Sequence, residues 1–132
     1  MFTISAKNTI MQSLFVGQTT IPCATYIGLS EADPGLDGTG ITEPAAHTGY
    51  SRVATNGAFQ VQAGSHGLVS NTLQITFPTF IADAGLINYY VLYDQNNNPF
   101  WYAPLQVQRI ADRDTTLAFK AGDLMIALQD AM

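Results

Sequence analysis

Charged side chains are scarce in this 132-residue chain. Five Lys and Arg residues and ten Asp and Glu residues make up only 11% of it, whereas about a quarter of an ordinary soluble domain is charged. A free monomer generally stays soluble through interspersed surface charge. The composition therefore favours a protein that packs against neighbouring molecules.

The few basic residues form no cluster. They are Lys7, Arg52, Arg109, Arg113 and Lys120, spread along a chain whose net charge is −5. A nucleic-acid-binding protein needs a basic patch or stripe to neutralise phosphates. We therefore expect no nucleic acid among the partners.

Cysteine and long apolar runs are also lacking. Cys23 is alone, which excludes an intrachain disulfide and a thiolate zinc cluster, and we expect it to be a small buried side chain. No run of about 18 apolar residues is present, so we expect no membrane partner. The N-terminus lacks a basic start followed by a long apolar stretch, which predicts an unprocessed product made in the cytosol.

Enzyme motifs are absent too. The sequence has no G-x-S-x-G elbow, no glycine-rich phosphate loop before a helix and no H-E-x-x-H. Two carboxylates could perform glycoside chemistry, but nothing selects a pair. We therefore predict a non-enzymatic protein that carries no cofactor.

Material for a hydrophobic core is plentiful. Hydrophobic residues make up 47% of the chain, including Phe 7, Tyr 6 and Trp 1. A chain of this length can bury roughly two-thirds of its unfolded surface. Neither an internal repeat nor a change of composition divides it, so we expect one domain over residues 1–132.

One short helix is predicted near residues 9–16. Its apolar residues share one face of a 3.6-residue period, and they are Ile10, Met11, Leu14 and Phe15. Thr9 and Gln12 fit a capping box, and Gly17 fits a C-terminal stop. Two turns are too short to be stable alone, so this helix must pack on something.

The remainder of the chain predicts antiparallel strands. Asn56-Gly57 is the strongest short-range hairpin signal, and it separates 51–55 from 58–62. Two further hairpins are predicted from 86–93 with 100–107, and from 116–119 with 124–128; single strands are predicted at 24–29 and 73–77. Together these segments predict one antiparallel, jelly-roll-like β-sandwich of about seven to nine strands.

Four carboxylates gather in the segment between 30 and 44. They are Glu31, Asp33, Asp37 and Glu43. An EF-type calcium loop that starts at Asp33 would have Gly35 and Pro44 at two ligand positions. The pattern therefore fails at two ligands, and we expect a solvated turn-rich loop without a metal.

Arg52 follows this loop and is predicted to be structural. One guanidinium can hold a loop by a bidentate contact with a carboxylate from Asp33, Asp37 or Glu43. The alternative is an exposed Arg that contributes at most about 1 kcal/mol.

Aromatic residues concentrate on the hairpin that includes 86–93 and 100–107. On adjacent strands some of them must lie on opposite faces, and we expect Ile87 and Val91 to face the core. Tyr90 and Tyr102 would then form an exposed surface for a protein interface or a sugar. This surface, or the helix face that carries Ile10 and Phe15, is the predicted self-association patch.

Short motifs follow one another along the chain in a recognisable order. They are Ala24-Thr-Tyr-Ile-Gly-Leu-Ser-Glu-Ala-Asp-Pro34, Asp37-Gly38, Glu43, Gly49-Tyr50-Ser51-Arg52-Val53, Asn71, Ile75-Thr76-Phe77-Pro78, Leu92-Tyr93-Asp94 and Phe119-Lys120-Ala121-Gly122-Asp123-Leu124. In order and spacing they closely resemble small tailed-phage proteins generally labelled tail fibre proteins. The resemblance covers nearly the whole chain, and the chain departs from it at Tyr89-Tyr90-Val91, where relatives often carry a Gly.

The resemblance implies a non-enzymatic virion component with a β-sandwich-like fold, made in the host bacterial cytoplasm. Such proteins serve in fibres, in baseplates and as capsid decorations. One function is a structural subunit that self-associates, as a trimer by analogy with similar phage proteins, and docks on other virion proteins. The alternative is a receptor-facing module that binds host surface glycan through exposed aromatics, Tyr90 and Tyr102.

Overall fold

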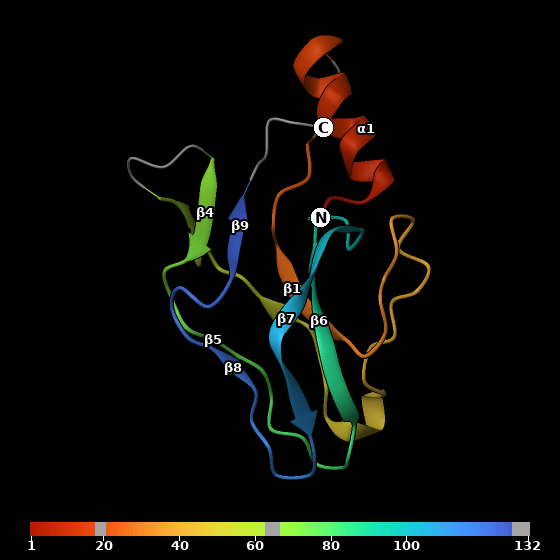
Figure 1. Ribbon diagram of the computed structural model, residues 1–132, viewed down its shortest axis with the longest axis vertical. Coiled ribbons are helices and arrows are strands. Elements are labelled where there is room, and N and C mark those ends of the chain that lie inside the picture. The colour runs from red at the N-terminus through yellow and green to blue at the C-terminus, as the bar shows by residue number, and fades with distance from the viewer. Residues whose placement is uncertain (18–20, 63–66, 128–132) are drawn as a thin grey trace.

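The first layer of the fold is a four-stranded antiparallel sheet. The computed structural model describes residues 1–17, 21–62 and 67–127. Within them this sheet has the order β2-β1-β6-β7. Its strands are β1 (Tyr26–Ser30), β2 (Val53–Ala54), β6 (Gly85–Tyr93) and β7 (Pro99–Ala111). The long β6–β7 hairpin predicted from the aromatic segments is confirmed, and it forms the centre of the molecule (Figure 1).

The second layer is an antiparallel ribbon in two parts. Its strands are β3 (Phe59–Val61), β4 (Leu68–Asn71), β5 (Ile75–Thr76), β8 (Ala118–Phe119) and β9 (Met125–Ala127). They form the sheets β3-β4-β9 and β5-β8. Backbone bonds from Phe77 N to Leu117 O and from Phe80 N to Thr115 O continue the second ladder beyond its strands. The predicted mainly β, antiparallel fold of about seven to nine strands is confirmed, with nine strands in the described residues.

Asn71 closes the break between the two parts of this ribbon. Its side chain is buried, with Nδ2 donating to Leu73 O at 3.0 Å and Lys120 O at 2.9 Å. Its Oδ1 accepts from Leu124 N at 3.0 Å. A buried amide is tolerated when its hydrogen-bonding groups are satisfied, so Asn71 replaces the ladder bonds that the sheets lack here.

The main core lies between the layers. The first sheet contributes side chains that alternate along its strands, among them Ile27, Leu29 and Leu92, and the second layer contributes Phe77 and Phe119. Phe77 and Phe119 meet edge to face at 6.1 Å between ring centroids, a favoured aromatic geometry. Burial of these large side chains is the main source of stability.

Two of the predicted hairpins are wrong in their pairing. Asn56 and Gly57 do form a tight turn, with φ of 48° and 72° and a bond from Ala58 N to Thr55 O at 2.9 Å. However, β2 before the turn pairs with β1, and β3 after it pairs with β4. The turn carries the chain from one layer to the other, and a local turn signal does not indicate which strand a segment joins.

The predicted third hairpin is corrected in the same way. The turn at 120–123 exists, with Asp123 N donating to Lys120 O at 2.9 Å. The strands around it separate, since β8 pairs with β5 and β9 pairs with β4. Residue 128, the end of that predicted hairpin, lies outside the described residues.

The helix α1 (Ile4–Phe15) begins five residues before the predicted start. Thr3 is its N-cap, and Thr3 Oγ1 accepts from Ala6 N at 3.2 Å. Thr9, the predicted cap, lies inside the helix and donates to Ser5 O at 3.0 Å. The helix begins early because Thr3 N donates to Phe100 O, which ties the first residues to the edge of β7. The predicted stop is correct, since Gly17 has φ 79°.

The position of Cys23 differs from the prediction. Cys23 is exposed, not buried as predicted, because it lies before β1 begins, where its N–H donates to the Gln95 side chain.

No helix in the described part of the chain has the length and apolarity needed to span a membrane.

We predict that Gly57→Val destabilises the protein by about 1–3 kcal/mol, because a β-branched residue is strained at positive φ. A Cβ at Gly57 would meet nothing within 4 Å, so a loss would report backbone strain and not a clash. Thermal unfolding measures it, with Asn56→Gly as a control that keeps the left-handed conformation accessible. An unchanged melting temperature for Gly57→Val would contradict the prediction.

Candidate functional site

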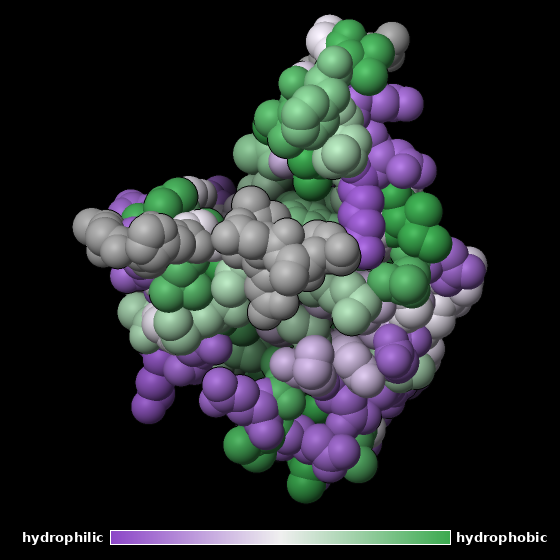
Figure 2. All heavy atoms as spheres, turned by 45° about the horizontal axis from the view of Figure 1, so that its top comes forward, coloured by the Kyte–Doolittle hydropathy of each residue, from purple (hydrophilic) through white to green (hydrophobic). Residues whose placement is uncertain are grey.

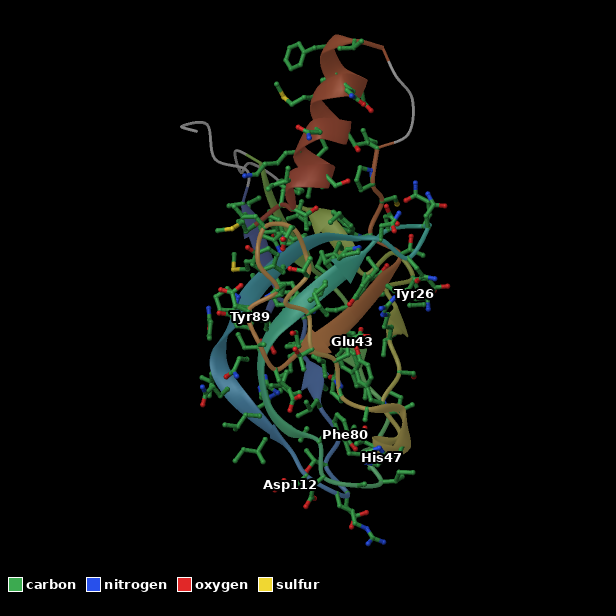
Figure 3. All side chains as sticks on the ribbon, turned by 90° about the vertical axis from the view of Figure 1, so that its right-hand side faces the viewer. Tyr26, Glu43, His47, Phe80, Tyr89 and Asp112 are labelled. Atoms are coloured by element: carbon green, nitrogen blue, oxygen red, sulfur yellow. The ribbon has the colours of Figure 1, made fainter. Side chains whose placement is uncertain are left out.

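The Glu43 carboxylate is the centre of a hydrogen-bonded cluster. Glu43 Oε1 accepts from Arg52 Nε at 2.8 Å and from the hydroxyls of Tyr50 and Tyr93, each at 3.0 Å. Glu43 Oε2 accepts from Arg52 Nη2 at 3.3 Å. Figure 3 shows Glu43 beside β1, on the loop that runs across the sheet. One carboxylate thus ties the loop to the segment before β2 and to β6. We call Glu43, Tyr50, Arg52 and Tyr93 the Glu43 cluster.

Arg52 also uses the face of an aromatic ring. Its guanidinium carbon lies 3.6 Å from the centroid of the Tyr93 ring. A planar guanidinium can stack and form a fork to a carboxylate at once, which an ammonium cannot do. Both charged partners are largely shielded, with side chains 32% exposed for Arg52 and 24% for Glu43.

Gly28 on β1 makes room for this cluster. A Cβ at this position would lie 2.7 Å from Tyr50 Oη, 2.9 Å from Glu43 Oε1 and 3.0 Å from Tyr93 Cε2. Tyr50 Oη also accepts from Leu29 N at 3.0 Å, beside this gap. Any larger residue at position 28 would displace a buried hydrogen bond.

Asp33 and Asp37 do not join Arg52. Asp33 Oδ1 accepts from Gly35 N at 2.9 Å, and Asp37 Oδ1 accepts from Thr39 N at 3.1 Å and Thr39 Oγ1 at 2.8 Å. The bonds from Thr39 lower the pKa of Asp37. In the described part of the chain, no three His, Cys, Asp or Glu residues lie close enough to hold a metal ion.

The Glu43 cluster has the character of a structural device. Its carboxylate accepts four hydrogen bonds, and both tyrosine hydroxyls donate to it. Sequence reasoning found Glu43 and Arg52 but missed Gly28, Tyr50 and Tyr93. All three stand in the motifs that carry the resemblance, and only the fold shows that these motifs meet at one point.

Tyr90 and Tyr102 correct the predicted exposed aromatic surface. Tyr90 is 3% exposed and Tyr102 is 6% exposed. Tyr90 lies in the main core, where its hydroxyl accepts from Trp101 Nε1 at 3.2 Å. Tyr102 belongs to a second, smaller core with Val91 and Tyr93.

A β-bulge explains the error. The register of β6 and β7 shifts between Ile87 and Tyr89, and such a shift moves every later side chain to the other face. Ile87 and Tyr90 therefore share the main core, whereas Val91 faces the opposite side. Ile41 from the loop and Tyr26 and Tyr89 cover the small core on that side.

The helix α1 carries several large apolar side chains that are exposed. It projects from the end of the sandwich (Figure 1) and is mostly hydrophobic on the face visible in Figure 2. Four exposed apolar side chains on its outer side, three of them along one line and Leu14 beside it, form what we call the outer stripe. They are Ile4 (49% exposed), Met11 (56%), Leu14 (68%) and Phe15 (74%).

The opposite side of α1 faces the body of its own chain. Ala6 is buried there, and Ser13 is half-buried with its hydroxyl oxygen enclosed and without a partner. Ile10 is half-buried at the margin, so the predicted face that joined Ile10 to Phe15 is divided between two sides of the helix. The usual arrangement, with apolar residues inward, is reversed, and no residue in the described part of the chain covers the outer stripe.

A hollow of about 660 Å³ lies at the base of α1. It is lined by Ile4, Asn8, Leu36, Asp37 and Asn98, among others. We call it the basal hollow. Ile4 N donates to Leu36 O at 2.9 Å, which fixes the loop beside the helix. The outer stripe is thus continuous, at Ile4, with a hollow of mixed polar and apolar lining.

Comparison with known families gives one match. Residues 1–127 match the family described as Podophage GP4 fiber I protein gp80. No match is found among curated proteins. The matched range includes α1, all the described strands and the whole Glu43 cluster.

We predict that Arg52→Lys loosens the loop between residues 31 and 49, because a lysine keeps the charge but loses the fork and the ring contact. Thermolysin should then cut near Leu36 and Ile41 several-fold faster than in the wild type. Arg113→Lys, at an exposed position, is the matched control. Equal cutting rates in the two variants would show that Arg52 does not hold the loop.

We also predict a loss of stability at alkaline pH. Burial raises the pKa of Tyr50 and Tyr93 above its ordinary value, and the nearby Glu43 charge raises it further. In the unfolded chain these hydroxyls ionise near pH 10, whereas the native state keeps their protons. The free energy of unfolding should therefore fall as pH rises above about 10.

Urea unfolding at a series of pH values from about 8 to 11.5 measures this dependence. Tyr93→Phe should make the alkaline decline shallower, because one of the retained protons is gone. Tyr26→Phe, outside the Glu43 cluster, is the control. An unchanged slope in Tyr93→Phe would contradict the assignment.

Proposed function

The chain belongs to the podophage fibre family described as GP4 fiber I protein gp80, and from this premise we propose that it is a self-associating structural subunit of a phage fibre. Membership makes it a virion component of structural character. We propose that one domain over residues 1–132, made in the host cytoplasm, forms a homo-oligomer, a trimer, and docks on other virion proteins. The family description favours a fibre over a baseplate or a capsid decoration.

The outer stripe is the observation that carries this proposal. Its four side chains are between 49% and 74% exposed, and an apolar patch at the surface often marks a site of interaction with another protein. Charged residues make up only 11% of the chain, against about a quarter in an ordinary soluble domain, which favours packing of this surface against a neighbouring molecule. A closed rotational assembly buries the same patch on every copy, which supports self-association.

The Glu43 cluster supports the same function in another way. The loop that it ties down covers the second face of the first sheet, so that Tyr93 and Tyr102 are buried. A sheet buried on both faces is a rigid platform that does not depend on a ligand. This suits a structural subunit that must keep one shape during assembly.

Glycan binding through Tyr90 and Tyr102 receives no support from their positions. A sugar platform needs an exposed ring face, and both rings lie in cores. The structural function is therefore the one we propose.

Light scattering on the purified chain tests self-association. At micromolar concentration we expect about three times the 14.2 kDa of one chain. A single 14.2 kDa species would overturn the oligomer. Mass spectrometry of purified, intact particles tests docking, and absence of the chain from them would overturn the virion role.

A further inference from the structure

We propose that the outer stripe is the seam between copies of this chain, with Lys7 of each copy seated in the basal hollow of the next, near Asp37. This inference rests on the proposed self-association and identifies the surface that performs it. The partner is a second copy, packed with its α1 parallel to the first.

The stripe has a spacing suited to helix packing. Ile4, Met11 and Phe15 are separated by seven and then four residues, so they follow a line of about 3.67 residues per turn, close to the period of a straight helix. Short parallel helices can therefore meet along this line with little supercoiling. Leu14 lies beside the line and widens the apolar surface.

The two sides of this line differ. One side carries Lys7 in line with Leu14, since these residues are seven apart. The other side carries Asn8 and opens into the basal hollow. One side therefore carries the cation of the helix, and the other is a hollow that contains the carboxylate of Asp37.

The charges on the two sides are complementary. Lys7 is the one charged residue of α1, and within the described part of the chain it forms no ion pair. Asp37 in the basal hollow is exposed, and its Oδ1 accepts hydrogen bonds from the N–H and the hydroxyl of Thr39. Both groups stand near the base of the helix, so a parallel neighbour brings Lys7 to the level of Asp37.

Because the two sides of the helix differ but are complementary in charge, they determine how copies of the chain can be related by symmetry. A contact between different surfaces of two copies is head-to-tail, and it closes into a ring when the rotation permits. A ring of three repeats the Lys7–Asp37 contact at every junction and gathers the three outer stripes at the axis. Stripe area alone falls short of the roughly 800 Å² per partner of a standard interface, and the contact in the hollow adds to it.

Charge reversal with rescue tests the seam. Lys7→Glu should raise the dissociation constant of the oligomer at least tenfold, as should Met11→Asp. The double variant Lys7→Glu with Asp37→Lys should restore association to within about threefold of the wild type. Lys120→Glu is the matched control, because it makes the same change of net charge on the exposed 120–123 turn.

Sedimentation equilibrium gives the dissociation constants, and circular dichroism confirms that each variant is folded. Asp37→Asn, which keeps the acceptor for Thr39, tests the carboxylate without disturbing its turn and should weaken association. A wild-type trimer that is weakened no more by Lys7→Glu than by Lys120→Glu would overturn the seam and leave the proposed function standing. A wild-type species of twice 14.2 kDa would overturn the head-to-tail contact, and a monomer would overturn both proposals.

Discussion

The saturated carboxylate of Glu43 is the interaction on which the rest of the fold depends. Its donors come from two parts of the chain, Tyr50 and Arg52 from the segment before β2 and Tyr93 from β6. Partial burial of a carboxylate costs free energy unless hydrogen bonds replace those that it made to water. Here the bonds that do so also hold a long loop against the sheet. Outside this cluster the loop is held by turn bonds of its own, such as those of Asp33 and Asp37, and by single bonds to other elements, such as that from Ile4 N to Leu36 O.

Fastening the loop changes the character of the first sheet. An antiparallel sheet commonly buries one face and exposes the other, but here the loop covers the second face. Val91, Tyr93 and Tyr102 form a small core under it. Aromatic side chains are thus needed on both faces of one hairpin, which explains their density better than an exposed binding platform does.

In the helix α1, the apolar residues that predict the element are not the ones that pack against the rest of the chain. Apolar spacing correctly indicates a helix, but the side it turns to the body holds Ala6 and Ser13 instead of its large residues. The reversal follows from the anchoring of Thr3 to β7, which sets where the helix starts and how it is rotated. In the seam that we propose, this rotation is what turns the outer stripe toward neighbouring copies.

The sequence by itself determined the mainly β class, the long aromatic hairpin, the tight turn at Asn56-Gly57 and the stop of the helix at Gly17, because each depends on neighbouring residues and local backbone preference. It also drew attention to Glu43 and Arg52 through their charge. Tertiary structure alone decided which strands pair across the 56–57 and 120–123 turns, since pairing partners are distant in sequence. It alone placed Tyr90 and Tyr102 in cores, because one bulge reversed the faces of β6 and a distant loop covered the side that alternation would leave open.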